Sequence, residues 1–275
     1  MTTIIRGPES GPPSPSEMTF EEELMEALSK PVSDPLDNVS IYLVGGAVRE
    51  IVRGFPEKVK DWDFAVAARS FDEMRDYLIE NGFEIFLETP QYFTIRARAP
   101  KDTFTFAGLD MTGKTFDFTL CRSEGDYTDG RHPDSVEVGT IREDLARRDF
   151  TMNAIALDAA GGLIDPFGGA EDIKVGLIRC VGGTERLRED SLRMLRAIRF
   201  AVQLDFNLSN EIVGFLYDVN NVPLLDNVSS ERIREELTKA FKADTLETLY
   251  YLQSYHALTA SIFSGDMWLL PTVKG

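Results

Sequence analysis

Cysteine is scarce in this 275-residue sequence, which contains only Cys121 and Cys180. The two lie far apart, and neither belongs to a CxxC pattern or to a cluster with histidine. This spacing argues against a disulfide framework and against a zinc site. We therefore expect a reduced, cytoplasmic protein in which the cysteines do not organise the fold.

Long apolar runs are absent as well. No stretch of about 18 apolar residues occurs, so the sequence predicts no membrane-spanning helix. The first residues are polar and rich in proline, unlike a secretory signal, and we interpret residues 1–16 as a flexible leader. A short acidic helix is expected next, within residues 17–37.

Positive charge is the third shortage. The chain has 29 Lys and Arg against 46 Asp and Glu, which gives a net charge of −17 and a pI of about 4.6. A field of this sign repels phosphate. A nucleic-acid ligand would therefore need a local basic surface, and its binding would be weak and salt-sensitive. The acidic balance also suits a protein that concentrates divalent cations.

What is present divides the chain into two parts. Apolar residues make up 43% of the sequence, enough for a sizeable core. Strand and helix patterns alternate up to about residue 160, and only helical patterns follow after about residue 184. In the first part we expect strands at 41–44 and 60–68, three more within 83–121, a polar loop at 123–139, and helices at 47–53, 71–81 and 143–158. In the second part we expect helices at 184–204, 210–220, 229–242 and 246–255.

Asp61 and Asp63 form the first candidate site. Two aspartates at i and i+2 of a strand share one face, about 6–7 Å apart along the chain, and their oxygens suit hard divalent cations. Two such cations stabilise phosphoryl transfer. This spacing is also common on ordinary surface strands. Asp117, in the sequence FDFTL, lies on a plausible neighbouring strand and is a candidate third catalytic carboxylate, although it could equally face solvent.

Two further blocks suit the binding of anions. Gly45 and Gly46 form a tight turn before a helix whose first turn carries Arg49; such a backbone can approach phosphate closely. Either feature alone would indicate only a turn. The second block is RRDFTMNA, in which paired arginines suit an anion and an asparagine suits a sugar hydroxyl, or in which the aspartate pairs with an arginine. Its candidate residues are Arg147, Arg148, Asp149 and Asn153.

The last block, EDSLRMLRAIRF, places Asp190, Arg193 and Arg196 three residues apart, on one face of the expected helix. The simplest interpretation is a set of weak salt bridges within the helix. A sharper one follows from base chemistry, because aspartate accepts from an exocyclic amino group and arginine donates to a ring nitrogen. Cytosine and adenine present that pattern, whereas guanine and uracil present its reverse. Asp190 and Arg193 could therefore select C and A without a nucleic-acid template.

Together these blocks resemble the motifs of one family, the class II tRNA nucleotidyltransferases (CCA-adding enzymes) and the related bacterial poly(A) polymerases. The similar segments are LVGGAVRE, DWDF, RRDFTMNAIALD, GGTERLREDSLRMLRAIRFAVQLDF and ERIREELTKAF, in the order and spacing of the family. They run from about residue 41 to 242. One departure is Glu50, where the family usually has aspartate.

The resemblance implies an α+β fold: a nucleotidyltransferase head, related to the palm of DNA polymerase beta, followed by an all-α neck. It implies a head at 38–160, a neck at 161–242 and a short remnant of the body domain at 243–275. It also implies that two Mg²⁺ ions bind at Asp61 and Asp63, and that CTP, ATP and the 3′ end of tRNA or another RNA are the partners. The nucleotide would be held by Gly45, Gly46, Arg49, Arg147, Arg148, Asp149, Asn153, Asp190, Arg193 and Arg196.

Three other functions remain open from the sequence. A poly(A) polymerase usually carries a GRRF-like basic element after the metal motif, and the comparable stretch TPQYFTIRARA lacks it, which favours CCA addition. A non-catalytic RNA-binding or nucleotide-sensing module would not need Asp61, Asp63, Asp190 and Arg193 intact. A nucleotidyltransferase that acts on another RNA is the third. The oligomeric state is left open.

Overall fold

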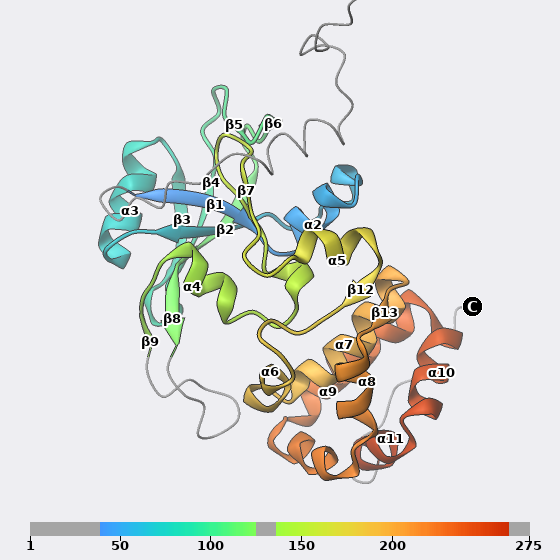
Figure 1. Cartoon of the computed structure of the whole chain (residues 1–275). Coiled ribbons are helices and arrows are strands. Elements are labelled where there is room, and N and C mark those ends of the chain that lie inside the picture. Colours follow the sequence, from blue (N-terminus) through green and yellow to red (C-terminus); the bar gives the residue numbers. More distant parts are fainter. Residues whose placement is uncertain (1–38, 125–135, 264–275) are drawn as a thin grey trace, which may run out of the picture.

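The computed structural model describes residues 39–124 and 136–263 (Figure 1). The expected leader at 1–16 and the expected helix within 17–37 lie outside these residues. A sheet with its covering helices forms one half of the molecule, and a bundle of helices forms the other (Figure 1). This arrangement confirms the α+β head and the helical region after it.

A seven-stranded mixed sheet organises the head. The two central strands run parallel, and every other neighbouring pair in the sheet is antiparallel. The three strands expected within 83–121 all belong to it. In spatial order the strands are β11 (Leu163–Ile164), β10 (Ala156–Leu157), β1 (Ser40–Val44), β2 (Asp63–Ala67), β7 (Thr115–Leu120), β4 (Thr94–Arg98) and β3 (Glu84–Thr89).

Both faces of the sheet are covered, as the strand pattern requires. One face buries Phe64 and Phe118, whose rings stack 5.2 Å apart, in a core with α2 (Gly46–Val52) and α3 (Phe71–Glu80). The other face packs against α4 (Ile141–Ala146). A capping box at Thr140 starts α4, because the Thr140 hydroxyl accepts from the Glu143 N–H while the Glu143 carboxylate accepts in return.

The second half is helical, apart from one parallel strand pair. Asp244 caps α10, and Ser209 caps α8 by accepting from the Ile212 N–H. The helices are α6 (Glu185–Glu189), α7 (Leu192–Leu204), α8 (Asn210–Tyr217), α9 (Ser230–Ala243), α10 (Thr245–Ser254) and α11 (His256–Ile262). The strand pair is β12 (Leu177–Ile178) with β13 (Asn207–Leu208).

Two expected helices are interrupted. The helix expected at 143–158 ends at Ala146, and the chain continues through a 3₁₀ turn, η3 (Thr151–Asn153), into β10. The helix expected at 184–204 breaks at Asp190, whose backbone is extended, and so becomes α6 and α7. Both breaks coincide with candidate site residues, whose side chains are thereby turned out of the helical register.

Three boundaries also differ from expectation. The sheet continues to Ile164, so the head extends past residue 160. The expected loop at 123–139 begins and ends in a short strand pair, β8 (Arg122–Glu124) with β9 (Val136–Val138), and residues 125–135 between them lie outside the described residues. The expected remnant of the body domain begins at residue 243, but α10, which lies beyond that residue, packs on α7 and α9 of the neck. Within the described ranges, no helix has the length and apolar character needed to cross a membrane.

Candidate active site

A cleft of about 820 Å³ lies between the head and the neck helices. All but one of the residues that the sequence predicts for the site line it, Asp117 being the exception. Eight basic and four acidic side chains face this cleft in the described part of the chain. The strongly acidic protein therefore concentrates positive charge where a phosphate ligand would bind. The basic residues are Arg49, Arg147, Arg148, Arg193, Arg196, Arg199, Arg232 and Lys239.

The glycine turn forms one wall of the cleft. Gly45 has φ +70° and ψ −135°, a conformation that disfavours any residue with a Cβ. A Cβ built on Gly45 would lie 3.4 Å from Nη1 of Arg148, and one built on Gly46 would lie 3.6 Å from Nη2 of Arg49. These are ordinary contact distances, so the positive φ of Gly45, and not crowding by the guanidinium groups, is what favours glycine at this turn.

Asp61 and Asp63 both line the cleft, but only Asp63 belongs to a strand. It is the first residue of β2, and Asp61 lies two residues before the strand. Desolvation and the nearby negative charges of Asp117 and Asp61 raise the pKa of Asp63 above its usual value. Carboxylates that repel one another in this way favour a bound cation. The donor set therefore fits Mg²⁺, which takes one or two protein carboxylates and completes its shell with water and phosphate.

Asp117 lies beside Asp63 and has a different partner. The two are paired in register across β2 and β7, so their side chains share one face of the sheet. Both carboxylate oxygens of Asp117 accept from Arg96 of β4, at 2.6 Å each. Within the described residues, no group of three or more acidic, His or Cys side chains is arranged to hold a metal. The catalytic role of Asp117 thus stays a prediction. Its carboxylate is already hydrogen-bonded to Arg96.

Asp144 anchors the paired arginines, and the sequence analysis missed it. Its Oδ1 accepts from Nη2 of Arg147 at 2.6 Å, and its Oδ2 accepts from Nη2 of Arg148 at 2.9 Å. Burial alone would raise the pKa of this 1%-exposed residue, but the charges of Arg148 and Arg147 outweigh it and lower the pKa. The spacing i, i+3 and i+4 on a helix was the available signal.

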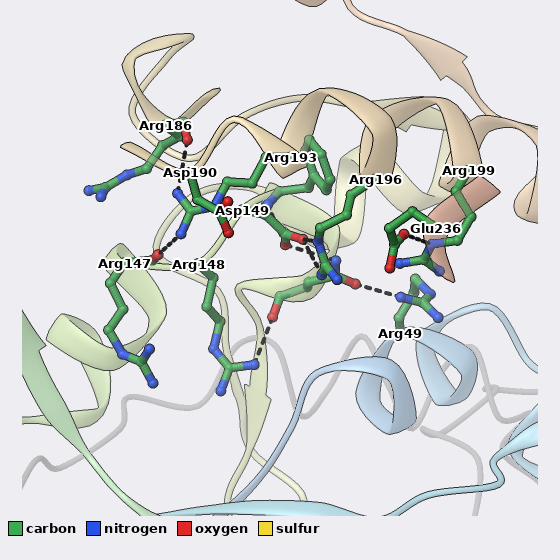
Figure 2. Close-up of polar contacts among 12 residues, drawn as sticks. Arg49, Arg147, Arg148, Asp149, Arg186, Asp190, Arg193, Arg196, Arg199 and Glu236 are labelled. Atoms are coloured by element: carbon green, nitrogen blue, oxygen red, sulfur yellow. Dashed lines mark hydrogen bonds and ion pairs between the residues drawn. The ribbon is translucent and has the colours of Figure 1, made fainter. Parts of the chain in front are cut away.

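Asp149 is the centre of a network that joins three elements (Figure 2). Arg196 of α7 donates to its Oδ2 from Nε at 2.9 Å, and the Asn153 amide donates to its Oδ1 at 3.0 Å. The Asn153 side-chain carbonyl in turn accepts from Nη1 of Arg49 at 2.5 Å. Burial opposes ionisation of Asp149, yet Arg196 and Asn153 hold its pKa at about 2. These hydrogen bonds link α2, η3 and α7 along the cleft wall, through Arg49, Asn153, Asp149 and Arg196.

Asp190 and Arg193 lie at the break between α6 and α7. Asp190 Oδ1 accepts from the Leu192 N–H at 3.2 Å. Figure 2 shows the Arg193 guanidinium between two backbone carbonyls: Nη1 donates to Arg186 at 3.1 Å and Nη2 to Arg147 at 3.0 Å. The neck residue Arg193 is therefore fixed partly by the head.

Several cleft residues follow the predicted ones along the neck. Arg199 donates to the buried Glu236 of α9, and its guanidinium carbon lies 3.7 Å from the ring centre of Phe200. Arg199 continues the three-residue spacing of Arg193 and Arg196, which was a usable signal. Arg232 and Lys239 lie on α9. No local sequence pattern predicted that this helix would line the cleft. The residues that the sequence analysis missed are Leu192, Arg199, Phe200, Arg232 and Lys239.

Family models match most of the described chain. Residues 41–179 match the poly A polymerase head domain. Residues 219–262 match a model described as the probable RNA and SrmB-binding site of polymerase A. The first match contains the glycine turn, both aspartates and the paired arginines, and the second begins after Arg196.

Curated relatives are similar to most of this chain. A CCA-adding enzyme of Geobacillus stearothermophilus is 42% identical over 200 residues, which are 72% of this chain and 44% of the relative. One of Lactococcus lactis is 38% identical over 225 residues, 79% of this chain and 51% of the relative. The chain thus spans about half the length of the curated relatives it matches.

Solved structures agree with these matches. The Bacillus stearothermophilus CCA-adding enzyme in complex with CTP superposes with a TM-score of 0.63 at 32% identity, covering 85% of this chain and 51% of that one. A tRNA nucleotidyltransferase complexed with a primer tRNA and an incoming ATP analogue gives 0.65 at 30% identity, with 84% and 61% covered. The described fold is therefore shared with 51% of the first of these chains and 61% of the second.

Proposed function

The chain belongs to the family of class II tRNA nucleotidyltransferases and bacterial poly(A) polymerases, and from this we propose that it transfers C and A from CTP and ATP to the 3′ end of tRNA. The addition is complete or partial and is directed by side chains instead of a nucleic-acid template. The relatives named CCA-adding enzymes, and the structures with CTP and with tRNA, support this activity over poly(A) synthesis.

One observation carries the proposal: a single cleft gathers the two acidic residues of the head and the base-reading candidates of the neck. Transfer of a chosen nucleotide needs both. Asp61 and Asp63 supply the charge for phosphoryl chemistry, and Asp190 and Arg193 supply the pattern that reads a base edge. The residues come from positions more than 100 apart in the sequence, so folding is what unites them.

Asp61 and Asp63 are the residues that would hold two Mg²⁺ ions. Ions bound there would supply positive charge that favours deprotonation of the attacking 3′ hydroxyl and neutralises charge on the triphosphate. The rest follows from the chain's own residues. Gly45 and Gly46 admit the triphosphate close to the backbone, and the cleft arginines orient it by charge.

The hydrogen-bond network around Asp149 orients the ribose of the nucleotide. Asp149 and Asn153 are buried and mutually bonded, so each has a fixed orientation. The Asn153 amide keeps one N–H and one carbonyl lone pair, which suit the hydroxyls of a ribose, whereas the oxygens of Asp149 already accept from Asn153, Arg196 and the Phe150 N–H. Arg49 and Arg196, bonded to Asn153 and Asp149, keep this pair from rotating. Preorganisation of this kind contributes to transfer by positioning the substrate.

Base choice follows from Asp190 and Arg193. The carboxylate accepts from the exocyclic amino group of C or A, and the guanidinium donates to the ring nitrogen beside it. Uracil and guanine would present an oxygen to the carboxylate and an N–H to the guanidinium. A buried mismatch of this type leaves polar groups unpaired, which costs about 1–3 kcal/mol for each group. CTP and ATP are therefore the substrates. Both cysteines are buried and neither forms a disulfide, consistent with a reducing, cytoplasmic setting.

The direct test supplies purified protein with tRNA lacking its CCA end, Mg²⁺ and one labelled nucleotide at a time. We expect C incorporation, A incorporation after C, and none of G or U. Long A-tails would instead identify a poly(A) polymerase. The absence of incorporation into tRNA and into other RNAs would refute the enzymatic function.

The cation-binding role predicts that Asp61→Ala and Asp63→Ala each abolish incorporation, because neither variant retains the carboxylate pair. Thermal unfolding should stay close to that of the parent, since both side chains lie at the open side of the cleft. Asp72→Ala is the matched control. The Asp72 side chain is largely exposed, and it forms an ion pair with Arg75 of the same helix, α3. Near-normal rates in Asp61→Ala would rule out the cation assignment.

A further inference from the structure

Asp190 has a second partner that its own helix does not supply. Nη2 of Arg232, on α9, donates to Asp190 Oδ2 at 2.9 Å. The Asp190 side chain is 20% exposed and that of Arg232 is 30% exposed, so the pair lies inside the cleft wall and not on the open surface. The two residues are 42 positions apart, and packing of α9 on α7 brings them together.

The side chains of Arg193 and Asp190 are not bonded to each other. The Arg193 backbone N–H donates to the Asp190 carbonyl at 2.9 Å, but in the described part of the chain no side-chain hydrogen bond or ion pair joins the guanidinium to the carboxylate. The Arg193 guanidinium is held by the carbonyls of Arg186 and Arg147, and its Nη1 lies 3.3 Å from Glu189 Oε2. Each candidate base reader thus has its own fixed partners: Arg193 is held by the head and α6, and Asp190 is held by α9.

This separation matters for reading a base. A carboxylate that pairs directly with a neighbouring arginine uses both the acceptor and the donor that a base edge needs. Arg232 occupies one oxygen of Asp190 from the opposite element, and lone pairs of the carboxylate stay available, since it offers about four acceptor sites. A charge-assisted bond also fixes orientation better than a neutral one.

We propose that Arg232 is a specificity-determining positioning residue, which holds the Asp190 carboxylate apart from Arg193 so that it can accept the exocyclic amino group of C or A. The inference rests on the proposed function. Arg232 acts on the base through Asp190 and takes no part in the transfer of the nucleotidyl group. The neck helix α9 thereby contributes to nucleotide choice, although its sequence contains no base-reading motif.

The test compares Arg232→Ala with the parent in single-nucleotide incorporation on tRNA, with kcat and KM measured separately for CTP, ATP and UTP. We expect the ratio of kcat/KM for CTP over UTP to fall about tenfold or more, the size of a lost charge-assisted bond. Most of the change should lie in the KM for CTP. Arg232→Lys, which keeps one charged donor, should restore part of the ratio.

Lys242→Ala is the matched control, because Lys242 is an exposed cation in the last turn of the same helix. It should leave the CTP to UTP ratio unchanged. An equal loss with all three nucleotides in Arg232→Ala, or an unchanged ratio, would overturn the positioning role. Both outcomes require an active parent protein, so they are distinct from failure of the proposed function, in which the parent itself adds nothing.

Discussion

Asp149 shows how one buried residue can set the geometry of a site. It is 7% exposed and carries a charge that would be costly to bury without partners. Arg196 and Asn153 compensate that charge from two different elements. Because removing one partner of a buried pair leaves the other uncompensated, these residues act as a unit.

The ionisation of Asp149 predicts an acid-sensitive fold. Its pKa is about 2 in the folded state and 3.8 in its ordinary state. A depressed pKa contributes stability that is fully present above the ordinary value and is lost as the pH falls toward the folded value. The free energy of unfolding should therefore drop by about 2 kcal/mol between pH 4 and pH 2 on account of this residue.

Urea unfolding at pH 5 and at pH 2 checks this expectation. Asp149→Asn should be less stable at pH 5, and its stability should change less between the two pH values than that of the parent. An equal pH dependence in both proteins would mean that other carboxylates account for the acid sensitivity.

At this scale the sequence predicted residue types well and partners poorly. Asp61, Asp63, Asn153 and Arg193 were expected to share one cleft, and they do. The bond from Arg96 to Asp117 depends on the order of strands in the sheet, which no local pattern specifies. The pairing of Asp149 with an arginine was an open alternative from the sequence, but its partner, Arg196 of α7, could not be identified before the fold was known.

Helix boundaries are where sequence patterns were least informative. Apolar spacing predicted continuous helices across 143–158 and 184–204, and both are interrupted. The interruption near Phe150 is imposed by packing, since η3 lies against the start of α5 (Gly169–Lys174). Local propensity cannot anticipate a tertiary contact of this kind. Five of the seven strands of the head sheet, β1, β2, β3, β4 and β7, were predicted, whereas β10 lies within the helix expected at 143–158.

The contact between α5 and η3 makes Gly169 irreplaceable. A Cβ on Gly169 would lie 2.1 Å from the backbone oxygen of Thr151. We expect Gly169→Ala to lower the free energy of unfolding by about 1–3 kcal/mol, the usual cost of overpacking. Because η3 carries Asn153, the KM for CTP should also rise. Thermal unfolding and steady-state kinetics measure the two effects.

Gly214→Ala is the control for Gly169→Ala, and we expect it to raise the free energy of unfolding instead of lowering it. Gly214 lies within α8, and nothing stands within 4 Å of a Cβ placed there. Alanine in a helix interior should stabilise the protein by about 0.5–1 kcal/mol without changing kinetics. A stable, fully active Gly169→Ala protein would show that η3 can move without harm.

The whole molecule separates its charge. A chain of net charge −17 has, among its described residues, a cleft with a surplus of four positive side chains. We therefore expect phosphate to bind in the cleft, which is a local basic surface. The expectation of weak, salt-sensitive RNA binding combines this local surface with the negative charge of the whole chain.

Salt dependence measures how many phosphates the cleft engages. With about four neutralised phosphates of a single strand, the logarithm of RNA affinity should fall with the logarithm of salt concentration with a slope of about −3. Fluorescence anisotropy with labelled RNA between 50 and 200 mM KCl, roughly the range where such slopes are read, gives the value.

Two lysines of α9 provide the comparison. Lys239 lines the cleft, so Lys239→Ala should make the slope shallower by about 0.7, whereas Lys242→Ala should leave it unchanged. A slope near −7 or steeper would place RNA phosphates outside the cleft, on parts of the surface with other cations.

The same separation of charge affects how a long RNA can approach the protein. An RNA that lies lengthwise against a chain of this net negative charge is repelled along its length, whereas an RNA that approaches with its end first brings only its last few phosphates to the basic cleft. Interior stretches of the strand then compete poorly with its terminus. The distribution of charge would select chain ends before any base is read.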